Sequence, residues 1–402
     1  MRIVFIGPFA MQPKRTMAVR ALPLARALVE RGHQVLMLLP PWDHPQDAGW
    51  EWVERGLRVY NVPLPARVPA LFHLCLTWRL LRECLRFRPE VVHCFKPKSY
   101  SGLSTWAVWQ LRNFGLLKAR LVVDADDWES SGGWNELERY SRLQKRFFAW
   151  QERWGLTHCD ALTVASRALE TIVWSLGVPR DRVHYLPNGW AGEQEPPDAS
   201  AQAELRCSLG LGDAPVALLY TRFFEFSVER ALAIMQGVLA AMPEVHWLVV
   251  GKGLFGEEKR LLEAAQDAGI AACITYAVWV PAAQVPQHLA LARVAIYPFD
   301  DTLVNRCKCA VKLMDLLAAG VPVVADRVGQ NAEYILDGAS GLLVAPGDTP
   351  AFVAATVRLL RDAELAAQLG RAARQRMHDQ FAWQRLVQTA ESAYSRGEAR
   401  AG

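Results

Sequence analysis

The stretch from residue 308 to residue 346 constrains the fold of this chain more than any other. Its apolar pattern predicts a helix over 310–319, which Gly320 ends in a left-handed conformation. A buried strand is expected over 321–324, a short helix carrying Glu333 after Gly329, and a further strand over 342–344. Two consecutive helix–strand units predict an open parallel sheet, in which ligands bind at the carboxyl ends of the strands.

Short apolar strands alternate with helices along the whole chain. The first series of expected strands lies near 1–9, 35–39, 90–93, 120–124 and 161–164, and the second at 216–220, 247–250, 273–276, 294–298, 321–325 and 342–344. Helices over 350–377 and 383–396 end the chain, and residues 190–200 read as a linker because they lack periodicity. A chain of 402 residues is also too long for one core. The predicted fold class is therefore α/β, with doubly wound Rossmann-like domains at 1–192 and 201–380 that face a central cleft. The C-terminal helix, 381–402, is expected to pack back on the first domain.

Composition and charge exclude several classes of protein. A formal net charge of +4 is too small to indicate nucleic-acid binding. The eight cysteines form no CxxC frame, and Cys307 and Cys309 lack the further ligands of a zinc site. The first strand follows Met1 directly and no apolar run has transmembrane length, so we expect a cytoplasmic protein, with peripheral attachment to the inner membrane face as the alternative. Gly7-Pro8-Phe9 does not fit the GxGxxG pattern of a dinucleotide oxidoreductase.

Polar residues gather after two strands of the first domain. Pro23 predicts a kinked first helix or one that begins near Ala21, which leaves Lys14, Arg15, Thr16 and Arg20 around a natural anion site. The strand at 120–124 ends in Asp124, followed by Asp126 and Asp127. These acids could activate an acceptor hydroxyl, cap the next helix or bind a metal. His93 ends another strand and is either an active-site residue or a buried core histidine.

Several short motifs occur in an order and spacing that resembles glycosyltransferase family 4, of the GT-B type. They are RGHQV at 31–35, PNG at 187–189, VGKG at 250–253, DLLAAGVPVV at 315–324, EYI at 333–335 and the segment 341–348. The resemblance covers nearly the whole chain. It implies a retaining enzyme that moves a sugar from a nucleoside-diphosphate sugar to a saccharide or lipid-linked acceptor, with no cofactor and no metal. The donor would bind mainly to the second domain.

The resemblance also implies roles for particular residues. Arg222 matches the arginine that contacts the diphosphate, but Ser227 stands where the family has a lysine. Lys312 is the expected substitute, preceded by Arg306 and Lys308. Asp315 matches an acid that binds the ribose, whereas Cys307 stands where its partner acid is expected, so Asp300 or Asp301 is assigned to the sugar. The remaining expected donor contacts are Gly7, Lys14, Thr16, Gly251, Gly253 and Leu313. The catalytic set comprises Asp126, Asp127, His93, Arg222 and Lys312.

Two further readings follow from these departures from the family pattern. The chain could be a nucleotide-sugar epimerase of the same fold or a non-catalytic nucleotide-sugar-binding protein.

A helix over 70–88 carries an apolar stripe and several arginines, which fits either a helix packed on the sheet or one that lies on an anionic membrane. The packed helix is the preferred interpretation. The stripe consists of Leu71, Leu74, Cys75, Trp78, Leu81 and Leu85.

Overall fold

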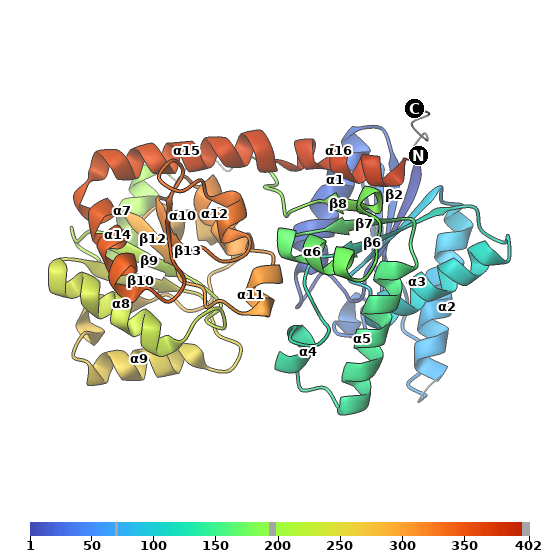
Figure 1. The fold of residues 1–402 in the computed structure, drawn as a ribbon, viewed down its shortest axis with the longest axis horizontal. Helices are drawn as coiled ribbons and strands as arrows, with labels where there is room; N and C mark the ends of the chain where they lie inside the picture. Colours follow the sequence, from blue (N-terminus) through green and yellow to red (C-terminus); the bar gives the residue numbers. More distant parts are fainter. Residues whose placement is uncertain (69–70, 193–197, 396–402) are drawn as a thin grey trace. The chain divides into compact units, whose positions relative to one another are not determined.

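The structure is a computed structural model that describes residues 1–68, 71–192 and 198–395. The chain forms two compact units. The first comprises residues 1–191, the short segment Cys307–Cys309 and the C-terminal part from Trp383, and the second comprises 192–306 and 310–382. Each unit contains one β-sheet with helices around it (Figure 1).

The sheet of the first unit has the strand order β3-β4-β2-β1-β5-β6-β7-β8. All neighbouring strands are parallel except β3, which pairs antiparallel with β4 at the edge. Alternate residues of β1 enter two different hydrophobic clusters, so both faces of this strand are buried. The strands are β1 (Arg2–Ile6), β2 (Gln34–Leu39), β3 (Glu51–Glu54), β4 (Leu57–Asn61), β5 (Val91–Phe95), β6 (Arg120–Ala125), β7 (Ala161–Val164) and β8 (Val183–Tyr185).

Helices connect these strands, and the last helix of the chain returns to the same sheet. The helix α16 (Trp383–Tyr394) packs against α1 and against β6, β7 and β8. The other helices of the unit are α1 (Leu22–Glu30), α2 (Leu71–Phe87), α3 (Ser99–Asn113), α4 (Trp134–Leu137), α5 (Arg142–Thr157) and α6 (Arg167–Ser175). Short 3-10 turns occur at Pro45–Asp47 and Arg180–Arg182, and a π-helical turn occurs at Met17–Ala21.

The second unit has a fully parallel sheet in the order β11-β10-β9-β12-β13-β14. The order reverses between β9 and β12, which is the switch point at which ligands bind in open α/β sheets. The strands are β9 (Val216–Tyr220), β10 (His246–Val250), β11 (Ile274–Tyr276), β12 (Val294–Tyr297), β13 (Val323–Asp326) and β14 (Leu342–Val344).

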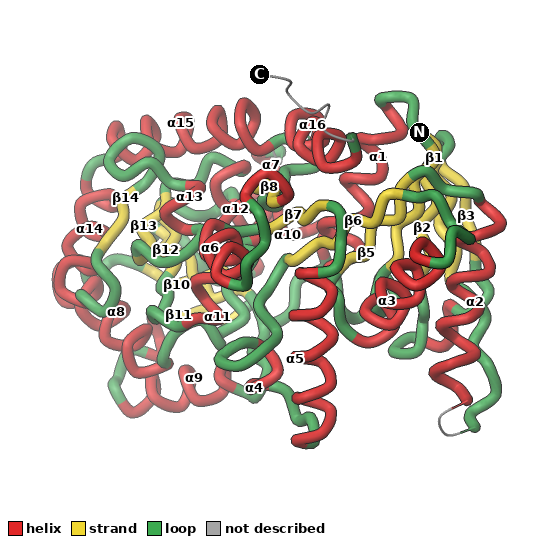
Figure 2. Tube along the Cα trace, turned by 45° about the vertical axis from the view of Figure 1, so that its right-hand side comes forward, coloured by secondary structure: helices red, strands yellow, loops and turns green. Residues whose placement is uncertain are grey.

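Nine α-helices are described in or at the boundary of this second part of the chain (Figure 2). They are α7 (Ala199–Ser208), α8 (Val228–Ala241), α9 (Glu257–Asp267), α10 (Val285–Leu289), α11 (Leu303–Cys307), α12 (Val311–Ala318), α13 (Asn331–Tyr334), α14 (Thr349–Arg361) and α15 (Ala363–Phe381). Two 3-10 turns, Ala271–Cys273 and Ala282–Gln284, complete the second unit.

Four expectations about local structure require correction or refinement. The helix expected over 350–377 is two helices, because the Asp362 side chain accepts a hydrogen bond from the Leu365 amide and caps α15. The hairpin β3–β4 was not predicted, although Arg55 and Gly56 both have positive φ, as a two-residue hairpin turn requires. The first α-helix begins at Leu22, after the π-helical turn, and therefore places Pro23 in its first turn. The C-terminal residues 396–402 of the expected last helix lie outside the described residues.

The expectation that the apolar stripe of the helix at 70–88 packs against the sheet is wrong. The buried side chains of α2 are Leu76, Thr77, Leu80 and Cys84. The stripe itself is largely exposed: Leu71, Leu74, Cys75, Trp78 and Leu85 are exposed and only Leu81 is partly buried.

Candidate functional site

The loop after β9 is held in a strained conformation next to Arg222. Phe223 has a φ of 69° although its bulky side chain is buried, a backbone state that costs on the order of 1–3 kcal/mol and is concentrated at functional sites. The Thr221 hydroxyl accepts a hydrogen bond from the Phe223 amide (2.8 Å) and donates one to Glu225 (3.3 Å). Arg222 is exposed at the carboxyl end of the strand.

Gly251 allows this loop to lie close to the end of β10. Its φ is 133°, and a Cβ atom at this position would lie 1.9 Å from the Thr221 carbonyl oxygen. Gly253 has a different role, because its amide donates to the Glu258 carboxylate (3.0 Å). The donor contact expected at Gly253 is not tested, but its amide already has a partner within the chain.

A second group of polar side chains lies at the start of α12, beside β9. The Lys312 ammonium is 3.4 Å from the centre of the Tyr220 ring, and the Tyr220 hydroxyl donates to Asp315 (3.4 Å). Lys312 and Asp315 are both partly exposed, one helical turn apart. Leu313 is completely buried, which does not favour the donor contact expected there. Sequence reasoning missed Tyr220, whose position at the end of a central strand was the available signal.

Ser227, which stands where the family has a lysine, has a structural role. The Ser227 hydroxyl accepts a hydrogen bond from the Arg230 amide (3.2 Å) and caps α8. The Arg230 guanidinium forms a bidentate pair with the buried Asp326 at the end of β13 (2.8 and 2.7 Å). Asp326 also accepts from the Phe299 amide (2.7 Å), and burial raises its pKa.

The residues between β12 and α12 are divided between several partners. Asp300 is partly exposed and lies 3.7 Å from Arg230. Arg306 forms a bidentate pair with Asp301 (2.5 and 2.8 Å). Lys308 and Cys307 belong to the segment 307–309 and are buried there.

The first unit contains a buried ion pair at the residue that sequence analysis assigned to an anion site. The Arg20 guanidinium donates to both oxygens of Asp124 (2.8 and 2.6 Å), to Asn188 (3.0 Å) and to the Leu186 carbonyl (2.9 Å). Both partners are completely buried. Arg20 is therefore a structural residue, and its inclusion in an exposed anion site is wrong.

Lys14 and Thr16 remain on the loop after β1. Lys14 is exposed, lies 3.7 Å from Glu138 and faces the Phe9 ring. Thr16 precedes the π-helical turn and its side chain makes no capping hydrogen bond there. Gly7 is explained by packing, because a Cβ atom there would lie 2.9 Å from side-chain atoms of Leu39 and Met17.

The acids after β6 form a network with Lys96. The Lys96 ammonium lies 3.0 Å from Asp127, 3.0 Å from Glu129 and 3.7 Å from Asp126. Lys96 itself has a φ of 51°, an uncommon backbone state for a lysine. Burial raises the pKa of Asp127 to about 6, although Lys96 opposes this shift. The helix-capping alternative is wrong, because α4 begins at Trp134 and has no side-chain cap.

A neighbouring acid completes this network. Glu152 accepts hydrogen bonds from the Glu129 and Ser130 amides (2.9 and 2.8 Å) and from the Ser130 hydroxyl. Burial, with the nearby charge of Glu129, raises the pKa of Glu152 to about 7. The pKa of Glu129 is lowered to about 2: burial acts to raise it, but Lys96 and Lys98 together outweigh burial. The cluster therefore holds one acid ionised and two acids close to their titration range at neutral pH.

Sequence analysis left two alternatives for His93, an active-site residue or a buried core histidine, and its surroundings are those of the second. It is completely buried, and its ring nitrogens lie 2.8 Å from the Tyr394 hydroxyl and 3.2 Å from the Thr163 hydroxyl. Burial lowers its pKa well below the usual value, so the ring stays neutral. The catalytic role predicted for His93 is untested, and this environment favours a structural one.

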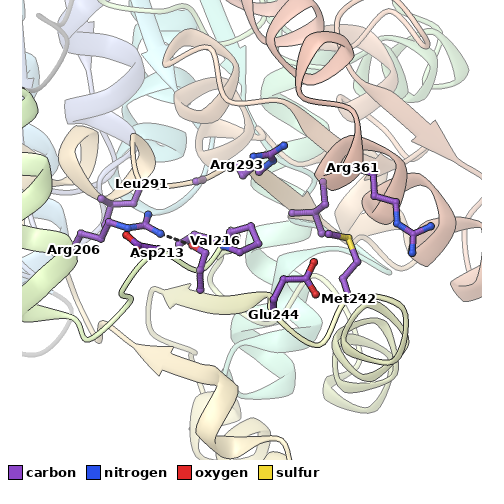
Figure 3. A pocket seen from close by; sticks show the side chains of 12 residues that line it. Arg206, Asp213, Val216, Met242, Glu244, Leu291, Arg293 and Arg361 are labelled. Carbon is purple, nitrogen blue, oxygen red and sulfur yellow. Dashed lines mark hydrogen bonds between the residues drawn. The ribbon is translucent and has the colours of Figure 1, made fainter.

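One cavity of the second unit lies at the opposite edge of the sheet from Arg222. It has a volume of about 560 Å³ and is lined at the amino ends of β9 and β12, by Val216 and Arg293 among others (Figure 3). Ligands bind at the carboxyl ends of parallel strands, so we place the site at the other edge. In the described residues no group of three or more His, Cys, Asp and Glu side chains could hold a metal ion. Nor does any helix among residues 1–68, 71–192 and 198–395 have the length and apolar character needed to cross a membrane.

Comparisons with known proteins agree with this architecture. A family model described as "Glycosyl transferase 4-like domain" matches residues 15–189, and one described as "Glycosyl transferases group 1" matches residues 215–362. The chain is similar to the GDP-mannose-dependent alpha-(1-6)-phosphatidylinositol monomannoside mannosyltransferase of Mycolicibacterium smegmatis, with 30% identity over 60% of this chain and 64% of the relative. Matches to the mycobacterial mannosyltransferases thus span less than two thirds of their length.

Two other relatives are matched over most of their length. The alpha-D-kanosaminyltransferase of Streptomyces kanamyceticus is 25% identical over 86% of this chain and 92% of the relative. Among solved structures, the sucrose-phosphate synthase of Thermosynechococcus elongatus superposes with a TM-score of 0.73 at 20% identity and covers 98% of both chains. With two α/β units and family matches along most of its length, the chain belongs to the family 4-like glycosyltransferases of GT-B fold.

Proposed function

We propose that this enzyme transfers a sugar from a nucleoside-diphosphate sugar to a hydroxyl group of a saccharide or lipid-linked acceptor, with retention at the anomeric carbon. The observation that carries the proposal is the group formed by Tyr220, Lys312 and Asp315 at the carboxyl end of β9, with Arg222 on the next loop. It combines positive charge with a carboxylate, which are the two features needed to bind a diphosphate and a ribose.

The diphosphate is assigned to Arg222, Lys312 and the amino end of α12. Two cations and the positive end of a helix dipole attract an anion. The Tyr220 ring lies against the Lys312 ammonium and fixes its position, an interaction of the cation–π type. Asp315 is assigned to the ribose, because a carboxylate can accept two hydrogen bonds from a vicinal diol.

In the reaction, the bond between the anomeric carbon and the diphosphate oxygen breaks and its electron pair leaves with the diphosphate. The acceptor oxygen attacks the same face of the sugar, and its proton passes to a phosphate oxygen of the departing group or to a nearby carboxylate. Arg222 and Lys312 stabilise the charge that develops on the leaving group. Because these side chains supply that charge, the proposed mechanism uses no metal ion.

Asp127 is our candidate for the acceptor-side carboxylate in the first unit. Its side chain is 14% exposed, against 5% for Asp126. A pKa of about 6 suits a group that accepts a proton near neutral pH. Lys96 holds the carboxylate at 3.0 Å and so fixes its orientation.

The test is nucleotide binding by wild type and a Lys312→Ala variant. Thermal stabilisation by UDP, GDP and ADP, and by their sugars, identifies the donor class, because a ligand stabilises the folded state by an amount that grows with its affinity. Loss of a charge-assisted contact of about 1.5–3 kcal/mol predicts nucleotide binding about 10- to 100-fold weaker in Lys312→Ala. Lys259→Ala, an exposed lysine on α9, is the matched control and should bind like wild type.

Two results would contradict the proposal. The first is that wild-type protein binds none of these nucleotides. The second is that Lys312→Ala binds them as well as the Lys259→Ala control does. Conversion of the donor sugar to an epimer without any acceptor would instead support the epimerase reading.

A further inference from the structure

The helix α5 presents apolar side chains to the solvent along one face. Leu143 is 78% exposed, Phe147 41% and Trp150 47%. The rings of Phe147 and Trp150 stack with their centres 5.8 Å apart, and Trp154 continues the row towards the end of the helix. Spacings of three and four residues place these side chains on one stripe, so this is a continuous apolar surface rather than scattered residues.

A row of arginines lies beside this stripe. Arg142, Arg146 and Arg153 each precede a member of the stripe by one residue and are all exposed. Among the described residues, none of the three has a carboxylate within ion-pair distance. The one acid within α5, Glu152, is buried on the opposite side. We call the surface formed by Leu143, Phe147 and Trp150 with Arg142, Arg146 and Arg153 the basic–aromatic face.

A second helix of the same unit repeats this character. On α2, Leu71 is 56% exposed, Leu74 65% and Trp78 57%, and the Arg82 guanidinium lies 5.1 Å from the Trp78 ring centre. Both α2 and α5 pack against α3. Figures 1 and 2 show that the amino-terminal ends of α2 and α5 project from the same side of the first unit. Leu71 and Leu74 of α2 and Leu143 and Phe147 of α5 lie near these projecting ends.

We propose that the basic–aromatic face, together with the exposed face of α2, docks the first unit on an anionic phospholipid bilayer. Leucine, phenylalanine and tryptophan insert at the boundary between headgroups and acyl chains, while arginines beside them bind phosphate groups. This proposal deepens the proposed function and rests on it, because it favours a lipid-linked acceptor over a free saccharide.

The chemistry of the surface distinguishes a bilayer from two other occupants. A saccharide platform needs hydrogen-bonding carboxylates or amides beside the rings, whereas the rings here are flanked by leucine and arginine. An acidic protein would pair with the arginines but gives no reason for a leucine at 78% exposure on the tip of the helix. Apolar side chains that project beyond a row of positive charges fit the layered chemistry of an anionic membrane.

The test is cosedimentation of the full-length protein with vesicles of phosphatidylcholine alone or with added phosphatidylglycerol. Wild type should bind the vesicles that contain phosphatidylglycerol and be released by salt. Replacement of Arg142, Arg146 and Arg153 by alanine should weaken this binding about fivefold per arginine, on the order of 100-fold in all. A Phe147→Ser/Trp150→Ser variant should also fail to bind these vesicles, even at low salt.

Matched controls exclude general effects of charge and hydrophobicity. Arg371→Ala and Trp279→Ser change exposed residues of the second unit and should bind vesicles like wild type. Nucleotide-induced thermal stabilisation, measured on every variant, shows that the fold and the donor site are intact. Equal binding to both kinds of vesicle, binding unchanged in the variants, or no vesicle binding with normal nucleotide binding would each overturn the membrane proposal. Loss of nucleotide binding in wild type would instead count against the proposed function.

Binding of soluble oligosaccharides or of an acidic peptide to this face, in place of vesicles, would also overturn the proposal. Serine variants of the two rings would then abolish saccharide binding, and the arginine variants would abolish peptide binding. Each occupant thus leaves a different pattern across the same set of proteins.

Discussion

Replacement of Arg20 by methionine should strongly destabilise the first unit. Methionine is similar in length but leaves the Asp124 carboxylate buried without its cation. All four hydrogen bonds donated by the guanidinium are lost, two of them to Asp124. The Thr163 hydroxyl, which donates to Asp124 at 2.5 Å, does not supply the missing positive charge.

The size of the effect follows from the geometry of the pair. Two opposite charges with centres about 4 Å apart attract by about 4 kcal/mol at the effective dielectric constant of about 20 that describes protein sites. Breaking a buried pair by removing one partner typically costs about 3–5 kcal/mol. We therefore expect the free energy of unfolding of the first unit to fall by about 4 kcal/mol in Arg20→Met. In Arg20→Met/Asp124→Leu neither charge remains, so the double variant should be more stable than the single one.

Denaturant unfolding followed by tryptophan fluorescence is the appropriate assay. Twelve of the fifteen tryptophans precede Ser200, so the signal reports mainly on the first unit. Nucleotide-induced stabilisation serves as a separate readout for the second unit, because two units need not unfold together. A loss below about 1 kcal/mol in Arg20→Met, the range of an exposed pair, would refute the reasoning. So would a double variant whose loss equals the sum of the two single losses.

Two further predictions concern the acid network and the glycine loop. The raised pKa of Glu152 means that the folded unit keeps this proton to higher pH than the unfolded chain, so its stability falls as pH rises from about 4.5 towards 7. Between pH 5.5 and 8 the fall due to Glu152 is about 2 kcal/mol, and Glu152→Gln should remove most of it; an unchanged pH dependence of denaturant unfolding would contradict the assignment. Gly251→Ala places a Cβ atom 1.9 Å from the Thr221 oxygen and should abolish nucleotide-induced stabilisation. Gly256→Ala, also at positive φ but with no atom within 4 Å, should cost only about 1 kcal/mol of stability and retain nucleotide binding; equal behaviour of the two variants would show that the close contact is unimportant.

The central strands could be predicted because their residues are apolar on both faces. The strands Ala161–Val164, Val216–Tyr220 and Leu342–Val344 begin and end where they were expected, and the other predicted strands differ by one to a few residues at their ends. The strands β3, β4 and β8 were missed because none has a continuous buried apolar run. β3 alternates between exposed and partly exposed residues, β4 between buried and partly exposed residues, and β8 is only three residues long. A local pattern of this kind is shared by many surface loops.

The candidate site was only partly accessible to sequence reasoning. Lys312 and Asp315 could be paired because four consecutive helical residues bring them to one side. Arg20 and Asp124 are 104 residues apart, so nothing local marks them as partners, and Arg20 was placed with exposed cations instead. The apolar stripe of α2 shows the same limitation. Periodicity reveals that a helix has an apolar face, but not whether another element covers it.

In both units, an ion pair between an arginine and an aspartate anchors the chain just after the candidate ligand loop. In the first unit, the loop after β1 that carries Lys14 and Thr16 is followed by Arg20, which is clamped by Asp124 of β6. In the second unit, the loop after β9 that carries Arg222 is followed by Arg230, which is clamped by Asp326 of β13. The strand that supplies the aspartate is in each sheet the second neighbour of the strand that precedes the loop.

A loop that is anchored in this way should lose less conformational entropy when it binds a charged ligand. An exposed arginine or lysine on a mobile loop loses conformational entropy when it closes on a phosphate. Here the chain is anchored a few residues after each loop by a bidentate, buried or largely buried ion pair, so less of that entropy remains to be lost. We therefore expect the two arginines to contribute to ligand binding without contacting the ligand. Weakening either pair should therefore affect nucleotide or acceptor binding through the neighbouring loop before it unfolds the unit.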